Sequence, residues 1–464
     1  MNRPRRISSP FLIGEGVSAL DEADTEMSSR RSLLRVLGLA FGISTVVGGM
    51  VGQGILRTPG IIAGAVHSPE LILALWIVGA LLAGITAFAY VELGTAIPCA
   101  GGAYDFVRRA FGPLPGVAAG WGVWLVMVTV EAFLAIVVAE FLHRLGVFPG
   151  LPTSVLAVGV LVIFWGLNST STRIAGDSQI AFSAFKGAAL IALIILLFAH
   201  PGETTREAPQ EIGDAVGLAA LAVAMRAVIN TYDGWAEVVY FGEEMKAPGR
   251  TLPRAMISGI VGVAVLYLLI NLALLKVLSP AQMAGSKLVA ADAVRLVLGP
   301  TGELAVTVFA LISVAAITNL TAMKTARISF ALGRARQLPS RLGEVASTGV
   351  PRWGLGVSSL LAMAFAATGT YEAIVAMNVA VGIVMVIAVN AAVIRLRHTE
   401  PDLVRPFRTP WFPLPPLVSI ALNGALLAAL IYEDPIHSLA GLFALACVGL
   451  VYFVIARRPR VQMG

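Results

Sequence analysis

Long apolar segments separated by short polar ones run along almost the whole chain. A helix that crosses the hydrocarbon core of a bilayer needs about 20 apolar residues, and segments of about that length recur about twelve times. The predicted spans are 36–64, 71–97, 114–142, 152–168, 178–199, 215–241, 254–278, 302–333, 354–369, 372–394, 412–431 and 438–456. This pattern predicts an all-α polytopic membrane protein with about 12 transmembrane helices.

The composition supports a lipid environment. Of the 464 residues, 57% are hydrophobic and 13% are charged, and the mean hydropathy is +0.85. An ordinary soluble domain is about 25% charged, so this chain is not a typical water-soluble enzyme. Cys99 and Cys447 are its two cysteines, which indicates neither a disulfide framework nor a thiolate metal site. We expect no metal and no cofactor.

Basic residues gather in alternate short loops, and such loops are usually cytoplasmic. With the N-terminus inside, the basic loops and tail contain Arg108, Arg109, Arg173, Lys246, Arg250, Arg254, Arg334, Arg336, Arg341, Arg352, Arg395, Arg397, Arg405, Arg408, Arg457, Arg458 and Arg460. An even number of spans then places both termini in the cytoplasm. The location of these basic residues in cytoplasmic loops accounts for their positive charge, so we expect no nucleic-acid partner.

A glycine cluster interrupts the first span at 47–55, in the sequence VGGMVGQGI. Each glycine destabilises a helix interior by up to about 1 kcal/mol, so the cluster favours local unwinding. Lipid cannot satisfy the freed backbone groups, and an unwound stretch must therefore face protein or a wet cavity. Close packing of two helices through small residues is the alternative explanation.

A second interruption, Asn230–Trp235, lies in the middle of the sixth span. Two broken helices that are five helices apart are typical of inverted repeats around a binding site at the membrane midplane. The free N–H groups at the start of a half-helix attract an anion, and the free C=O groups at its end attract a cation. An amino acid carries both charges. The two interruptions together favour a site for a small zwitterion.

Three motifs resemble the amino acid-polyamine-organocation superfamily, and within it the bacterial relatives of the L-type amino acid transporters. Residues 49–56 with Pro59 and Gly60 are similar to the family's G-x-x-G-x-G-I-F segment and the proline that follows it. Residues 90–104 are similar to Y-x-E-L-G…P-x-A-G-G-x-Y, and residues 243–254 to E-E-x-K-x-P-x-R-x-L-P-R. The similarity covers most of the chain.

The resemblance implies a five-plus-five inverted repeat (LeuT-type) with discontinuous helices 1 and 6, and secondary transport of amino acids or related amines. The implied organisation is a cytoplasmic tail at 1–35, helices 1–5 at 36–199, helices 6–10 at 213–395, helices 11–12 at 412–456 and a tail at 457–464. Eukaryotic relatives often attach a heavy chain through a cysteine between helices 3 and 4. Residues 143–151 contain no cysteine, so we expect no disulfide-linked heavy chain.

The resemblance also implies the substrate contacts. The backbone of Gly52, Gln53 and Gly54 would bind the substrate carboxylate. The amino group would lie on carbonyls near Val47 and Gly48 and near Asn230 and Thr231, and Asp233 and Trp235 complete the candidate site. Asn230 stands where many relatives carry an aromatic gate. Asp233 could contact a cationic substrate, but Asp-Gly is also ordinary turn chemistry.

Two ionisable residues inside spans are candidates for ion coupling, because such groups usually face the bundle interior. Lys186 in the fifth span resembles a lysine that replaces a sodium ion in sodium-independent relatives; the alternative is that its long stem snorkels to the cytoplasmic surface. Glu131 in the third span could carry a proton. It could instead form a structural ion pair with Arg226 or Lys324.

The cytoplasmic side has its own charged cluster. Arg327 and Arg334 are seven residues apart and share a helical face, from which they could pair with Glu243 and Glu244. Glu92 is expected in the same layer. We interpret these residues as a candidate cytoplasmic gate.

These observations predict a multi-pass permease of the cell membrane that transports amino acids by alternating access, without sodium, as a proton symporter or an exchanger. The five histidines fall at helix ends or in loops, and metal-hydrolase and nucleophile motifs are missing from the sequence, which argues against an enzyme. An amine or polyamine antiporter of the same fold and a non-transporting amino acid sensor are the alternatives.

Overall fold

The computed structural model describes residues 32–52, 54–200, 217–286, 288–368 and 371–456, and the regular elements in this part of the chain are helices. The tails expected at 1–35 and 457–464 lie outside it, apart from residues 32–35. The helices are α2 (Leu39–Met50), α3 (Gly54–Val66), α4 (Pro69–Ala96), α5 (Ala103–Phe111), α6 (Pro113–Arg144), α7 (Thr153–Thr170), α8 (Thr172–Ala199), α9 (Leu218–Tyr232), η1 (Trp235–Phe241), α10 (Pro248–Val277), α11 (Pro280–Ala284), α12 (Val289–Leu298), α13 (Pro300–Arg334), η2 (Ser340–Gly343), α14 (Arg352–Thr368), α15 (Tyr371–Thr399), α16 (Leu414–Glu433) and α17 (Pro435–Ala456).

The predicted all-helical membrane fold is confirmed. Among the described residues, 8 helices are long and apolar enough to cross a membrane, or up to 9 when the bent pair α2 and α3 counts as one span. The other predicted spans correspond to α9 with η1, to the 17-residue α14 and to α17, whose described apolar part is shorter. The count of about 12 therefore stays a prediction, as does the inverted-repeat relation.

Three short helices were not expected from the apolar pattern. The 9-residue α5 follows the second predicted span, and α11 and α12, of 5 and 10 residues, follow the seventh. A search for spans of about 20 apolar residues passes over such short elements. Proline and glycine mark their ends: Gly112, with φ 92°, separates α5 from α6, and Ser279 with Pro280 begins α11.

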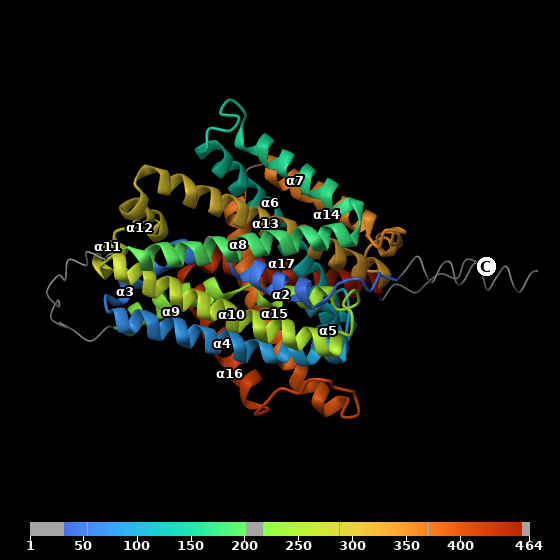
Figure 1. Cartoon of the computed structure of the whole chain (residues 1–464). Helices are drawn as coiled ribbons and strands as arrows, with labels where there is room; N and C mark the ends of the chain where they lie inside the picture. Colours follow the sequence, from blue (N-terminus) through green and yellow to red (C-terminus); the bar gives the residue numbers. More distant parts are fainter. Residues whose placement is uncertain (1–31, 53, 201–216, 287, 369–370, 457–464) are drawn as a thin grey trace, which may run out of the picture.

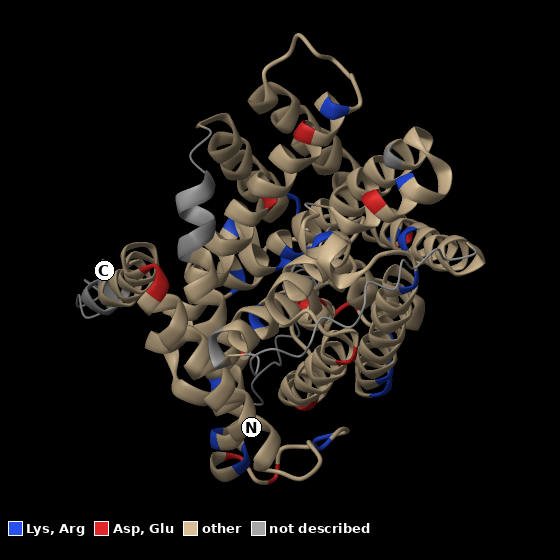
Figure 2. Ribbon diagram, turned by 90° about the vertical axis from the view of Figure 1, so that its left-hand side faces the viewer, with Lys and Arg blue, Asp and Glu red and all other residues tan. Residues whose placement is uncertain are grey.

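Most of the long helices run roughly along one direction (Figure 1). The first half of the broken first span, α2, lies within the bundle and packs on α8 and α10. The helices α3, α9, α11 and α12 gather at one end of the molecule and α5 lies towards the other (Figure 1). Seen from the α11 and α12 end, most of the ribbon is uncharged (Figure 2), as a lipid environment requires.

Candidate substrate site at two helix breaks

The first predicted interruption is a real break. Helix α2 ends at Met50, Val51 and Gly52 are not helical, and α3 starts at Gly54 with its axis turned by 42°. Gln53 lies outside the described residues. The last carbonyls of α2 and the first N–H groups of α3 therefore face each other across the break without the hydrogen bonds of a continuous helix.

The second interruption also breaks its helix. Helix α9 ends at Tyr232, and Gly234 adopts the left-handed conformation with φ 105° before the 3₁₀ helix η1 begins at Trp235. Asn230 and Asp233 are exposed, whereas Thr231 is buried. Glycine adopts positive φ values without the strain that a Cβ introduces, which explains why the turn falls at this Asp-Gly pair.

The two breaks touch each other backbone to backbone. A Cβ added to Gly234 would lie 2.6 Å from the Gly49 carbonyl oxygen and 2.9 Å from the Met50 nitrogen. A Cβ on Gly54 would lie 3.3 Å from Thr231 Cγ2, so the start of α3 contacts the end of α9. Two interruptions that are about 180 residues apart in the sequence thus form one place in the structure.

Lys186 binds the carbonyls of the first break. Its side chain is fully buried on α8, and Nζ donates to Gly48 O at 2.8 Å and to Val51 O at 2.7 Å. The ammonium therefore points to the helix end and not to the cytoplasmic surface. A cation at the carbonyl end of a helix is stabilised by both the hydrogen bonds and the helix dipole.

Two further side chains at the breaks were missed by the sequence analysis. The Tyr267 hydroxyl of α10 lies 2.8 Å from Met50 O and 3.2 Å from Thr231 O, so it can donate to either broken helix. Ser313 Oγ of α13 donates to Val51 O at 3.2 Å. Neither residue belongs to a charged or glycine-rich motif; an isolated polar side chain within an apolar span was the available signal.

Trp235 follows the second break and packs against α4. Its ring is buried, and its centroid lies 5.0 Å from that of Tyr90 on α4 in an edge-to-face arrangement of 87°. Such aromatic pairs contribute about 0.5–1.5 kcal/mol beyond their buried area. The contact fixes the start of η1 against α4.

A buried chain of polar side chains runs beside Lys186 and was also missed. Asn168 Nδ2 of α7 donates to Asn319 Oδ1 at 3.0 Å, and Asn319 Nδ2 of α13 donates to Gln179 Oε1 at 3.0 Å. Ser183 Oγ, one turn from Gln179 on α8, donates to Ser44 O at 2.7 Å. This chain joins α7, α13 and α8 to the first half of the broken first span.

Glu131 lies on α6 in the interior of the bundle. It is 1% exposed, and its Oε2 has no hydrogen-bond partner in the described part of the chain. Neither of the ion pairs considered from the sequence forms: Arg226 pairs with Glu433, and Lys324 pairs with Glu237. The alternative of a structural ion pair with Arg226 or Lys324 is therefore not what the structure shows, because both cations pair with acids of other helices.

The charged residues of the candidate gate form separate ion pairs. Arg327 and Glu244 are both buried, with Nε to Oε2 at 2.6 Å and Nη2 to Oε1 at 2.9 Å, and Arg334 pairs with Glu243. The fifth candidate, Glu92, does not join them. It accepts from Arg397 Nη2 at 2.7 Å, and Arg405 Nε lies 3.3 Å from its other oxygen.

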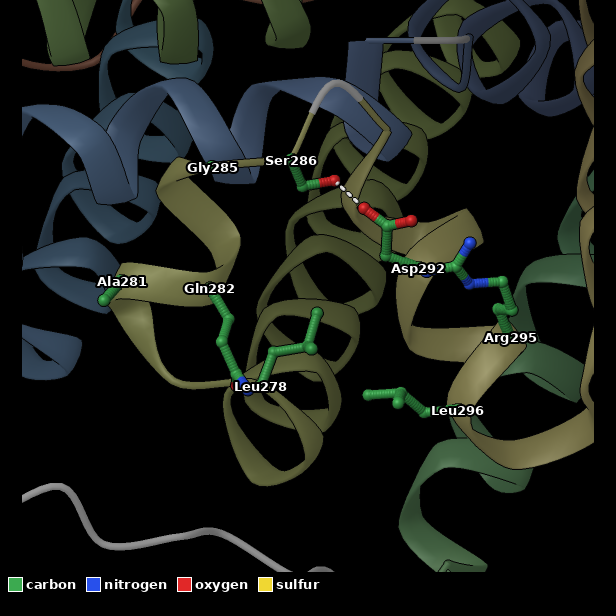
Figure 3. Close-up of a pocket in the computed structure, with 8 residues that line it drawn as sticks. All are labelled: Leu278, Ala281, Gln282, Gly285, Ser286, Asp292, Arg295 and Leu296. Atoms are coloured by element: carbon green, nitrogen blue, oxygen red, sulfur yellow. Dashed lines mark hydrogen bonds between the residues drawn. The ribbon is translucent and has the colours of Figure 1, made fainter.

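A cavity of about 310 Å³ lies elsewhere, at the end of α10 between α11 and α12 (Figure 3). Ser286 Oγ donates to Asp292 at its mouth. None of its lining residues belongs to either break. The candidate substrate site is therefore defined by the backbone geometry of the breaks and not by this cavity.

A bundle of apolar helices in which two broken helices meet at their interruptions defines a membrane transporter of small solutes. The chain belongs to the amino acid permease family, whose model matches residues 32–453. It is 27% identical over 447 residues to the b(0,+)-type amino acid transporter 1 of Mus musculus, covering 94% of this chain and 91% of that protein.

Two other relatives are exchangers or transporters by name. The serine/threonine exchanger SteT of Bacillus subtilis is 24% identical, with 92% of this chain and 98% of that protein covered. The cystine/glutamate transporter of Homo sapiens is 27% identical, with 92% of this chain and 87% of that protein covered. The chain is thus an amino acid permease of the same superfamily and not an enzyme.

Proposed function

We propose that this permease transports amino acids by alternating access without sodium, as a proton symporter or as an amino acid exchanger. The contact between the two breaks is the observation that carries the proposal. The contact brings the start of α3 next to the end of α9 and the end of α2 next to the Gly234 turn, which supports a site where N–H groups and carbonyls bind one small solute.

The substrate carboxylate would bind the backbone of Gly52, Gln53 and Gly54, where the positive end of the α3 dipole supports an anion. The substrate amino group would bind carbonyls near Val47 and at Asn230 and Thr231. Lys186 already occupies Gly48 O, so this carbonyl would contribute through the lysine. Asp233 is exposed at the break and could take the amine of a cationic side chain.

Lys186 supports sodium independence. Its ammonium is held by two carbonyls of the first break, and a sodium ion would need similar oxygen ligands. A fixed positive charge at this position makes a sodium ion there unfavourable. Transport should therefore proceed unchanged when choline replaces sodium.

Glu131 is the proposed proton carrier. A carboxylate that is buried in an apolar span without a cation partner is costly, and protonation removes that cost. Reversible protonation at this position would link transport to a pH gradient. An exchanger would use the same substrate site and leave Glu131 protonated throughout the cycle.

We propose that Glu92, Glu243, Glu244 and Arg327 close the cytoplasmic side. Their ion pairs join α4 and the turn after η1 to α13, α15 and the segment before α16. The proposed orientation has both termini in the cytoplasm and the chain in the cell membrane. Cys99 is buried and Cys447 lies within α17, which supports a permease without a disulfide-linked heavy chain.

A counterflow screen of the purified protein in liposomes tests the proposal. Each natural amino acid and several small amines are loaded inside, and uptake of the same labelled solute is followed in choline medium, with and without a pH gradient. We expect uptake of at least one amino acid at the same rate in sodium and in choline. A strict sodium requirement would overturn the role of Lys186, and binding without uptake would identify a sensor.

A further inference from the structure

Three cationic side chains of α13 form a ladder of ion pairs with the acidic residues at and after η1. Lys324, Arg327 and Arg334 are three and seven residues apart and therefore lie on one face of the helix. They pair with Glu237, Glu244 and Glu243, respectively. We call these three pairs the α13 ladder.

Burial differs strongly along the α13 ladder. Its cytoplasmic pair is partly exposed, since the Arg334 and Glu243 side chains are 37% and 20% exposed. The middle pair of Arg327 and Glu244 is almost completely buried, at 4% and 0%. The middle pair is therefore the most buried of the three. We call the pair of Lys324 and Glu237, at 3% and 21% exposed, the inner pair because it lies next to the first break.

The inner pair lies directly against the two breaks. A Cβ added to Gly49 would lie 3.2 Å from Glu237 Cγ, and Glu237 follows the Gly234 turn by less than one helical turn. Lys324 is 3% exposed, and its Nζ lies 5.7 Å from the centre of the Tyr240 ring. The pair thus connects three elements: the first break, η1 and α13.

A buried ion pair of this kind has two stable arrangements. While the protein around it is dry, separating the charges leaves each one uncompensated, and the closed arrangement is strongly favoured. Once water enters, both charges are solvated and the cost of separation falls. The Glu237 side chain is 21% exposed, but its Oε2, the oxygen that pairs with Lys324, is buried, so the pair itself is dry in this structure.

We propose that Glu237 and Lys324 are positioning residues that latch η1 onto α13 while the substrate site is closed to the cytoplasm. The inference rests on the proposed transport function and adds the element that links the breaks to the inner gate. Opening towards the cytoplasm admits water from the surface, so the partly exposed pair of Arg334 and Glu243 separates before the buried pairs. Separation of Glu237 from Lys324 then releases η1 and the first break from α13.

The test compares single and double variants of the full-length protein in liposomes of sorted orientation. Glu237→Gln and Lys324→Met each remove one charge, and the combined Glu237→Lys and Lys324→Glu variant exchanges the two charges. Lys324→Arg is the conservative variant. Arg109→Gln is the matched control, because Arg109 forms an exposed ion pair with Glu400 away from the breaks.

We expect each single variant to favour the inward-open state. The KM for substrate supplied from the extracellular side should then rise about tenfold or more, while the KM from the cytoplasmic side falls. The charge-exchanged variant and Lys324→Arg should restore both KM values to within about threefold of wild type. If the pair had a purely structural role, its loss would change the two KM values in the same direction. Arg109→Gln should change neither KM value.

Equal KM values for the single variants and the wild type on both sides would overturn the latch. So would single variants that lose activity symmetrically and are not rescued by the charge exchange. A wild-type protein that moves no amino acid would contradict the proposed transport function instead. In that case the rate of backbone amide hydrogen exchange in η1 tests the latch. This rate should increase in the single variants and return to the wild-type value in the double variant in which the two charges are swapped.

Discussion

At the scale of single residues, Gly49 and Gly234 determine whether the two breaks can meet. The structure leaves no room for a Cβ between them, and Gly234 also has a positive φ. The sequence indicated the glycine cluster and the Asp-Gly turn, but it could not show that these two segments touch. A contact between backbones leaves no side-chain pattern in either segment.

Gly234→Ala should abolish transport while the protein still inserts into the membrane. The new methyl group would force the breaks apart and would strain the left-handed turn, at a cost of about 1–2 kcal/mol for the backbone alone. Counterflow uptake in liposomes and the amount of purified protein measure the two effects.

Gly84→Ala is the matched control for this variant. Gly84 lies inside α4, and nothing lies within 4 Å of an added Cβ. Alanine there should leave uptake unchanged and should favour the helix by about 0.5–1 kcal/mol. Uptake by Gly234→Ala at the rate of Gly84→Ala would contradict a role for the contact between the breaks.

At the scale of elements, Glu92 shows how a carboxylate in a helix organises the segments around it. It binds two arginines, and it accepts the backbone N–H of Thr409 at 2.7 Å. Helix α4 thereby holds the end of α15 and the segment before α16. The carboxylate is fully buried, and it is the acidic partner of both arginines, which also donate to backbone carbonyls.

Glu92→Gln should lower the free energy of unfolding by about 2–5 kcal/mol, because it leaves Arg397 and Arg405 near the interior without a negative charge. Thermal unfolding of the detergent-purified protein measures this effect. Arg109→Gln breaks an exposed pair and should cost at most about 1 kcal/mol. A melting temperature for Glu92→Gln equal to that of Arg109→Gln would show that the cluster contributes little.

The contribution of the exposed Arg109–Glu400 ion pair to stability also depends on pH, and the direction of that dependence follows from the pKa of Glu400. Hydrogen bonds from Arg109 lower the pKa of Glu400 below its usual value. The pair therefore contributes stability above the unfolded pKa of Glu400 and loses it as the pH falls through the lower folded value. Glu92→Gln and Arg109→Gln are accordingly best compared near neutral pH, where Glu400 is ionised.

The sequence predicted the elements better than their partners. Apolar segments of about 20 residues located the long spans. The glycine cluster at 47–55 and the Asp-Gly pair at 233–234 located the two breaks. These signals are local, so the sequence alone shows them. The partners of Lys324 and Arg226 are set by how whole helices rotate and pack, so the sequence left an ion pair with Glu131 open, and neither cation forms one. Tyr267 and Ser313 stayed hidden because single polar residues in a span have no characteristic pattern.

At the scale of the whole molecule, the polar groups are arranged around the breaks in an otherwise apolar bundle. Lys186, Tyr267 and Ser313 bind the carbonyl ends at the breaks, while the α13 ladder and the Glu92 cluster join helices by ion pairs. In the proposed function, the start of α3 is the part of the break that binds the solute. This arrangement fits a transporter that must hold a zwitterion and then release it on the other side.

Substrate binding by variants of the first break tests the central claim most directly. Gly54→Ala and Gly52→Val add side chains that press on Thr231 and Ile317 beside the proposed carboxylate site, and Gly262→Val adds a valine side chain at an open position of α10. Equilibrium binding of the amino acid identified by counterflow is measured on each purified protein. We predict at least about a hundredfold loss of affinity for the two break variants, equivalent to ~3 kcal/mol, and wild-type affinity for Gly262→Val. Wild-type affinity in all three would contradict a substrate site built from the helix breaks.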